Sequence, residues 1–239
     1  MKLQHIALIG YSGLIGSNFA SQIKQKNLKV DYFNSKNISK INTKKKYDLV
    51  FCAALPAAKW YANKYPKIDF KNTTSLIKKL NNINTKLFIL ISTIDVWFKH
   101  PYGKNRLRLE RYVCKKFNKK FIIRLPGVFG RGLKKNVIFD LIKKNNLDNI
   151  FINDEFQWYD LSYLSKDIFK IINKNKSGLF ELYSEPVSNL QILKYFKKIK
   201  VFQNRDKPIL YNFIPKDGYY ISKRKILTRI KKFIFSNEH

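Results

Sequence analysis

Short apolar runs alternate with longer amphipathic stretches through the first half of the chain. The apolar runs stop at small residues, which is typical of strands buried on both faces of a parallel sheet. The stretches between them carry apolar residues three and four positions apart, the spacing of one helix face. Repetition of strand and helix predicts right-handed crossovers and a parallel sheet.

The expected elements follow from this pattern. We expect strands at 6–9, 30–33, 48–53, 87–91 and 121–124, and helices at 14–24, 69–80 and 102–117. Beyond residue 126 the pattern is less regular, and we expect helices at 136–144, 167–172, 190–199 and 223–232 and a strand at 180–183. A chain of 239 residues accommodates one α/β domain with a small additional lobe.

A glycine-rich turn joins the first strand to the first helix. In this context Gly10 would permit a tight turn, Gly13 would let the backbone approach a pyrophosphate, and Gly16 would allow close helix–strand packing. The helix N-terminus adds free N–H groups and a partial positive charge. The turn predicts a Rossmann-type doubly wound parallel sheet that binds NAD(P). Contacts to the cofactor are expected from Gly10, Ser12, Gly13, Leu14, Ile15 and Gly16.

Four later segments strengthen this interpretation. They read CAA at 52–54, ISTIDVW at 91–97, YGKNRLRLE at 102–110 and RLPGVFG at 124–130. With the glycine-rich turn, and in this order, they resemble landmarks of the extended short-chain dehydrogenase/reductase family, whose members act largely on nucleotide sugars. The resemblance is close over residues 6–132 and looser beyond.

The resemblance implies three catalytic residues. Thr93 would hydrogen-bond the reacting oxygen of the substrate, and Tyr102 would be the general acid/base. A nearby cation lowers the pKa of a phenol, which is ordinarily near 10. The family places lysine at the position of Arg106. Arginine keeps the charge, but its fork does not reproduce the ammonium that holds the cofactor ribose, so activity could be altered or lost.

Further cofactor contacts are implied by the same resemblance. Ala53 and Ala54 would line the cofactor cleft, and the segment Pro126, Gly127 and Val128 would neighbour the nicotinamide.

The choice between NADP and NAD depends on the end of the second strand. We expect Asn34, Ser35 and Lys36 to stand there, and these residues suit a ribose 2′-phosphate and favour NADP. NAD stays open, because Asp31 would be the ribose acid if the strand ends earlier.

The second half would supply a substrate lobe. We expect an NAD(P)-binding domain over 1–132 and a smaller, partly interleaved lobe over 133–239. There Arg131 would meet a diphosphate, and Gln157, Trp158 and Tyr159 would contact a sugar or uridine; the aromatic residues also suit a core. The short link between Thr93 and Tyr102 suggests an open or small substrate site.

These features lead to a functional prediction. We expect an NAD(P)-dependent oxidoreductase or epimerase acting on a nucleotide-linked sugar, a ketosugar reductase or epimerase rather than a dehydratase. Surface-polysaccharide biosynthesis is the expected setting, and a homodimer through the helix that begins at Tyr102 is expected. The alternative is a non-catalytic NAD(P)-binding regulatory or scaffold protein, suggested by Arg106.

Composition changes this picture little. The net charge is +32, but the lysines are scattered and accompany many Asn and Ile residues, as AT-rich codons would produce. We therefore do not expect nucleic-acid binding, although a polyanion surface stays open. No signal peptide or apolar stretch long enough to span a bilayer is evident, which favours the cytoplasm.

The cysteines and histidines suggest no further chemistry. Cys52 and Cys114 lie far apart and lack any metal spacing, so we expect both to be reduced and buried. His5, His100 and His239 show no ligand pattern, so no metal is expected.

Overall fold

The structure of the protein is a computed structural model that describes residues 3–24, 27–41, 44–174, 177–196, 199 and 203–237. The chain forms two compact units. The first contains Met1–Arg124 and Tyr163–Phe180, and the second contains Leu125–Ser162 and Glu181–His239. The two units are interleaved in sequence, because the first stretch of the first unit ends at Arg124 and residues 163–180 return to that unit.

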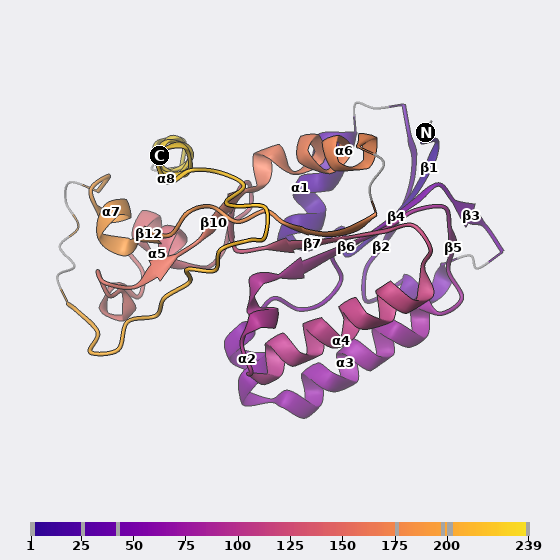
Figure 1. Ribbon diagram of the computed structural model, residues 1–239, viewed down its shortest axis with the longest axis horizontal. Helices are drawn as coiled ribbons and strands as arrows, with labels where there is room; N and C mark the ends of the chain where they lie inside the picture. Colours follow the sequence, from indigo (N-terminus) through magenta and orange to yellow (C-terminus); the bar gives the residue numbers. More distant parts are fainter. Residues whose placement is uncertain are drawn as a thin grey trace. The chain divides into compact units, whose positions relative to one another are not determined.

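A six-stranded sheet forms the centre of the first unit (Figure 1). Its strands, in spatial order, are β11 (Gly178–Glu181), β7 (Lys120–Leu125), β6 (Phe88–Thr93), β4 (Leu49–Cys52), β1 (His5–Ile9) and β2 (Lys29–Phe33). Strand β1 pairs in parallel with both β2 and β4, and β4 pairs in parallel with β6. The chain thus winds outward from β1 in both directions, which confirms the expected doubly wound fold.

Helices cover both faces of this sheet (Figure 1). On one face lie α1 (Leu14–Ile23) and α6 (Leu164–Asn173); on the other lie α2 (Lys59–Lys64), α3 (Pro66–Leu80) and α4 (Pro101–Lys116). Phe19 of α1 stacks on Phe51 of β4 with ring centroids 4.0 Å apart. Leu80 and Val113 of the opposite helices are fully buried. Burial on both faces explains the uninterrupted apolar runs of the strands.

Smaller elements complete the first unit. They are η1 (Ile38–Lys40), the parallel strands β3 (Lys46–Tyr47) and β5 (Asn84–Thr85), and η2 (Ile94–Trp97).

The second unit has its own apolar core. Its elements are β8 (Gly127–Phe129), α5 (Val137–Lys143), η3 (Leu147–Asn149), β9 (Glu155–Phe156), β10 (Trp158–Asp160), η4 (Leu161–Tyr163), β12 (Val187–Ser188), α7 (Asn189–Leu193) and α8 (Lys223–Phe235). Strand β8 pairs with β10 and β9 pairs with β12. The expected amphipathic final helix is confirmed, since Ile226, Ile230 and Ile234 of α8 are fully buried in this core.

Two sequence-based expectations need correction. The helix expected at 190–199 ends at Leu193, because Tyr195 and Phe196 turn back through bonds to the carbonyls three residues earlier. Cys52 is buried as expected, but Cys114 is exposed, since it occupies the outer face of α4.

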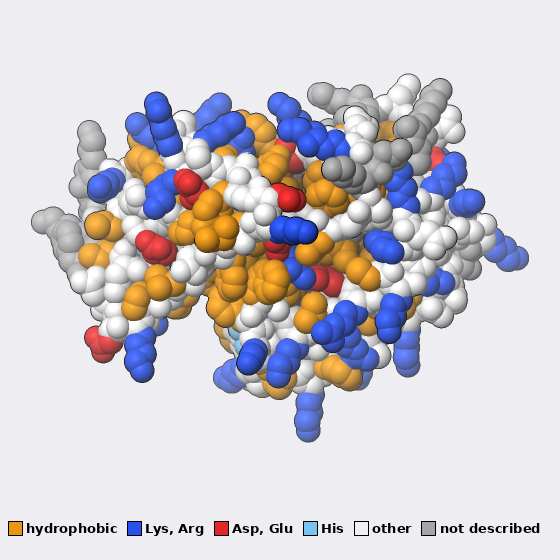
Figure 2. Space-filling model, in the orientation of Figure 1, with side chains coloured by type: hydrophobic (Ala, Val, Ile, Leu, Met, Phe, Trp, Pro, Cys, Tyr) orange, Lys and Arg blue, Asp and Glu red, His pale blue; other side chains and the backbone are white. Residues whose placement is uncertain are grey.

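Two further observations concern the basic side chains on the surface and the length of the apolar helices. Lysine and arginine side chains are distributed over the visible face rather than gathered in one patch (Figure 2). Within the described ranges, no helix is both long and apolar enough to cross a membrane.

Candidate functional site

The glycine-rich turn is closed on two sides by the chain's own backbone. Gly10 has a φ of +90°, a conformation that side chains disfavour, and its N–H donates to the Phe33 carbonyl at 2.7 Å. A Cβ on Gly10 would lie 2.3 Å from the Ala53 carbonyl oxygen. A Cβ on Gly16 would lie 2.1 Å from the Gly10 oxygen. Packing of the sheet and helix therefore requires glycine at both positions.

Gly13 differs from its two neighbours. Its φ is −81°, which any residue adopts, and a Cβ there would meet only the Gly10 oxygen, at an ordinary 3.5 Å. It is also the N-cap of α1, where it makes no side-chain cap. The fold thus gives no reason for the missing side chain, and the space it leaves lies at the α1 N-terminus, where a helix carries free N–H groups and a partial positive charge. The exposed Ser12 and half-buried Leu14 and Ile15 flank this position.

The end of β2 lies beside the turn. Asn34 directly follows the strand, and its Nδ2 donates to the Tyr11 hydroxyl at 3.4 Å. Its Oδ1 accepts from the Lys36 N–H at 2.9 Å, and Ser35 and Lys36 are exposed. Asp31 is engaged elsewhere, by the Tyr47 hydroxyl at 3.1 Å among others. Burial raises the pKa of Tyr47 to about 12, and the Asp31 carboxylate adds to this shift.

The segment after β4 also meets the turn. The Ala53 N–H donates to the Ile9 carbonyl at 2.9 Å, and a Cβ on Gly10 would lie 3.0 Å from the Ala54 Cα. The structure therefore brings together the glycine-rich turn, the end of β2 and the two alanines, which were predicted from separate stretches of sequence.

Thr93 ends β6 and caps η2. Its hydroxyl accepts from the Asp95 N–H at 3.2 Å and donates to Asp95 Oδ2 at 3.0 Å. Asp95 Oδ1 lies 2.8 Å from Lys59 Nζ of α2 and 3.4 Å from His100 Nε2. Lys59 was not predicted as part of this group, because it precedes Asp95 by more than thirty positions.

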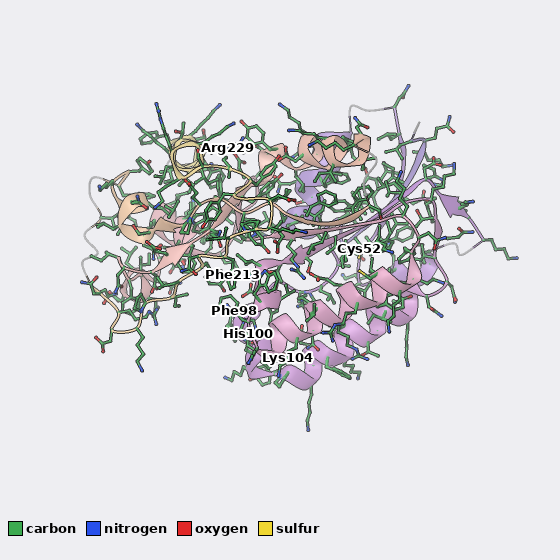
Figure 3. The ribbon with its side chains drawn as sticks, viewed as in Figure 1. Cys52, Phe98, His100, Lys104, Phe213 and Arg229 are labelled. Carbon is green, nitrogen blue, oxygen red and sulfur yellow. The ribbon has the colours of Figure 1, made fainter. Side chains whose placement is uncertain are left out.

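Tyr102 lies at the first turn of α4, close to this group. Figure 3 labels Phe98, His100 and Lys104, which gather at this end of the helix. The His100 side chain caps α4 by accepting the Gly103 N–H at 3.0 Å. A Cβ on Gly103 would lie 2.1 Å from the Asp95 carbonyl oxygen, so glycine lets α4 approach η2.

The Tyr102 side chain is buried, with 7% of its surface exposed. Burial raises the pKa of Tyr102 above its ordinary value; the Arg106 guanidinium opposes this, and the Asp95 and Asp69 carboxylates add to it. The guanidinium carbon of Arg106 lies 4.2 Å from the centroid of the phenol ring, so the cation faces the ring of Tyr102.

Arg106 is held by a group that sequence reasoning missed. Its Nη2 and Nη1 donate to the two oxygens of Asp69 at 3.0 and 3.2 Å, and Nη2 also donates to the Pro56 carbonyl at 2.8 Å. Asn105 donates to Asp69 at 2.7 Å. The predicted residue Arg106 thus links α4 to α3 and to the loop that follows Ala54.

A second buried ion pair fixes the far side of α4. Glu110 accepts from Arg124 Nε and Nη2 at 3.0 and 2.7 Å and from the Ser92 hydroxyl at 2.5 Å. The Arg124 guanidinium lies 4.9 Å from the Trp97 ring centroid. This cluster ties β6, α4 and β7 together next to Thr93, which gives Glu110 a structural role.

The remaining predicted residues belong to the second unit. Pro126 is buried, Val128 is half-buried, and Gly127 and Arg131 are exposed. Gln157, Trp158 and Tyr159 are buried, with 1 to 2% of their surfaces exposed. The Gln157 amide bonds the Ser184 and Phe213 backbone at 2.8 to 3.1 Å. Their interior positions suit a core, and their contact with a substrate stays a prediction.

Acidic, cysteine and histidine side chains form no candidate metal centre in the described part of the chain. His239 lies outside that part.

Comparisons with known proteins establish the fold. No protein-family model matches the sequence, and no curated protein matches it either. A dTDP-4-dehydrorhamnose reductase from Bacillus anthracis, solved with NADP, has a TM-score of 0.73 at 16% identity, covering 99% of each chain. A UDP-N-acetylglucosamine 4-epimerase from Methanobrevibacter ruminantium, solved with UDP-N-acetylmuramic acid, has a TM-score of 0.73 at 14% identity, covering 100% of this chain and 98% of that one.

A third structure, the enzyme WbmG of Bordetella bronchiseptica in complex with NAD, has a TM-score of 0.67 at 13% identity, covering 99% of this chain and 93% of that one. Each alignment therefore spans both units of this protein rather than the six-stranded sheet alone. The chain has the same Rossmann-type fold as solved nucleotide-sugar reductases and 4-epimerases.

Proposed function

We propose that the protein is an NAD(P)-dependent oxidoreductase or epimerase of nucleotide-linked sugars. The observation that carries this proposal is the contrast among the three glycines of the first turn. Gly10 and Gly16 are required by packing, whereas the bare α1 N-cap at Gly13 is explained by a phosphate ligand. Likeness to structures solved with NADP and with NAD supports the same ligand class.

NADP is the cofactor we favour. Asn34 follows β2 directly and contacts the glycine-rich turn, and the exposed Ser35 and Lys36 come next. A hydroxyl and a cation suit a 2′-phosphate, whereas an acidic residue at this place would favour NAD. The engagement of Asp31 by His5 and Tyr47, two residues before the end of β2, supports this preference.

The nicotinamide supplies or accepts a hydride when the cofactor is bound. The chain's own residues then handle the proton. Tyr102 exchanges a proton with the sugar oxygen, and Thr93 orients that oxygen through its hydroxyl. The short contacts of η2 with the start of α4 keep the two side chains in one neighbourhood. Arg106 supplies a fixed positive charge beside the Tyr102 ring.

The proposal extends to the substrate, the oligomeric state and the cellular role of the protein. We propose a nucleotide-linked ketosugar or sugar as substrate, with Arg131, Gln157, Trp158 and Tyr159 of the second unit as candidate contacts. A homodimer through α4, a cytoplasmic location and a role in surface-polysaccharide biosynthesis complete the proposal. Size-exclusion chromatography with light scattering would test the dimer.

A non-catalytic NAD(P)-binding protein is the second candidate. The observation that favours it is the engagement of Arg106 by Asp69 and Pro56, which occupies much of the guanidinium fork. Under this alternative, the protein binds the cofactor without turning over any sugar.

Calorimetric titration of the ligand-free protein with NADPH and NADH tests the proposal. We expect micromolar binding, tighter for NADPH. Absence of binding to both cofactors would refute both candidates. If binding is found, turnover of a panel of nucleotide-linked ketosugars and sugars, followed by cofactor absorbance and product chromatography, separates the enzyme from the non-catalytic binder.

A further inference from the structure

A buried carboxylate compensates the charge of Arg106. Asp69 and Arg106 form a two-pronged ion pair, and their side chains are 4% and 6% exposed. Asn105 donates a third hydrogen bond to the same carboxylate. The pair therefore carries no net charge, and the arrangement leaves the Asp69 oxygens well bonded despite their burial.

The other charged groups near Tyr102 are compensated as well. Lys59 from α2 forms an ion pair with Asp95 from η2 at 2.8 Å, and His100 caps α4 while its Nε2 faces the same carboxylate. Lys59 of α2 and Arg106 of α4 thus each have a carboxylate partner, Asp95 on η2 and Asp69 on α3. A phenolate at Tyr102 would lack the uncompensated cation that usually stabilises it.

We propose that Asp69 is a positioning residue that neutralises Arg106 and keeps Tyr102 in its phenol form, so that the site donates a proton and takes keto sugars as its substrates. This inference rests on the proposed function and narrows it to a reductase. The direction of the Tyr102 pKa agrees, because burial raises it and the Asp95 and Asp69 carboxylates add to the shift against the lowering effect of Arg106.

The reaction balances without a further reactant. The carbonyl carbon gains a hydride from the reduced nicotinamide, which is oxidised. The π electrons of the C=O bond move to the carbonyl oxygen, and this oxygen takes the Tyr102 hydroxyl proton. The product is an alcohol, and the phenolate left behind takes a proton from water. An epimerase must instead begin by removing a proton from an alcohol, for which a neutral phenol is poorly suited.

The test is the titration of Tyr102 in the cofactor-free protein. The chain has 14 tyrosines, so the ultraviolet absorbance of tyrosinate is measured against a matched Tyr102→Phe chain and the difference is assigned to Tyr102. We expect Asp69→Asn to lower the Tyr102 midpoint by about one unit or more, because Arg106 is then uncompensated. Asp69→Glu is expected to restore most of the original midpoint.

Circular dichroism checks that each variant folds, and a second variant serves as a control. The double substitution Asp69→Asn, Arg106→Gln removes both charges and is expected to leave the midpoint close to that of the unaltered chain. An unchanged midpoint in a folded Asp69→Asn chain would overturn the proposal. If that chain does not fold, the double variant decides: a midpoint raised well above that of the unaltered chain would overturn the proposal, because it would show that Arg106 had acted without compensation.

Turnover supplies the second readout. We expect reduction of keto sugars to be constant between neutral and mildly alkaline pH, and Asp69→Asn to move its alkaline decline to lower pH. Epimerisation without net reduction would contradict the proposal while leaving the proposed function intact. Absence of cofactor binding would instead refute the proposed function, whatever the titration shows.

Discussion

Gly13 is the residue at which fold and function are most clearly separable. A methyl group there would meet only ordinary contact within the protein, but it would occupy the approach of a phosphate to the α1 N-terminus. We expect Gly13→Ala to weaken NADPH binding by roughly 10- to 100-fold, the cost of about 1–3 kcal/mol for overpacking a close contact. Calorimetry measures the binding, and thermal unfolding should be almost unchanged.

Gly16→Ala is the matched control for this prediction. Its Cβ would lie 2.1 Å from the Gly10 oxygen, a backbone atom that cannot move away alone. We therefore expect a lower melting temperature from this variant. Equal loss of stability in both variants would show that Gly13 serves packing rather than a ligand.

At the scale of elements, Asp48 joins the starts of β1 and β4. Its carboxylate accepts the Gln4 and His5 N–H groups at 2.9 and 3.0 Å and pairs with Lys86 at 2.7 Å. The hydrogen bond from Lys86 lowers the pKa of Asp48 to about 2 against partial burial, with help from the two backbone donors. A lowered folded-state pKa adds stability above about pH 4 that is lost as pH falls toward 2.

The variant Asp48→Asn tests this contribution. We expect its free energy of unfolding to fall by about 1–2 kcal/mol at neutral pH, and the difference to shrink below about pH 4 and become small as the pH falls through about 2. Urea unfolding at several pH values measures it, with the exposed Asp217→Asn as control. A difference that does not depend on pH would assign the loss to packing.

Elements whose contacts are close in sequence were predictable, whereas contacts between distant positions were not. Gly10 and Gly16 act on neighbours close in sequence, so the strand, turn and helix around them were readable. The partner of Arg106 is 37 positions away on α3, and no periodicity joins the two. The helix expected to extend to residue 199 ended at Leu193, because its apolar spacing is equally satisfied by a turn that buries Phe196.

In the second unit, sequence patterns also did not reveal that the candidate substrate contacts are buried. Gln157 and Trp158 combine polar and aromatic groups, as binding residues often do, but such side chains also fill interiors when their polar atoms find partners. The Gln157 amide is bonded to the Ser184 and Phe213 backbone, contacts between residues 27 and 56 positions apart. Sequence alone cannot distinguish these two uses.

At the scale of the whole molecule, the charge of +32 needs a physical interpretation. The basic side chains are spread over the visible face in Figure 2. The electrostatic field of scattered lysine and arginine side chains attracts any polyanion weakly. Salt at 0.1 M screens this field over about 10 Å. It also raises the encounter rate of a phosphate-bearing ligand, while the affinity of such a ligand depends on local contacts such as those at Gly13.

Salt dependence therefore separates a general field from a nucleic-acid site. We expect a labelled DNA duplex, followed by fluorescence anisotropy, to show only nonspecific association at about 50 mM salt and to be released by about 200 mM. NADPH binding should persist at the higher salt, because the α1 N-terminus and its turn supply short-range hydrogen bonds as well as charge. Tight duplex binding at about 200 mM would instead indicate a specific nucleic-acid surface, and the scattered lysines would then require a function of their own.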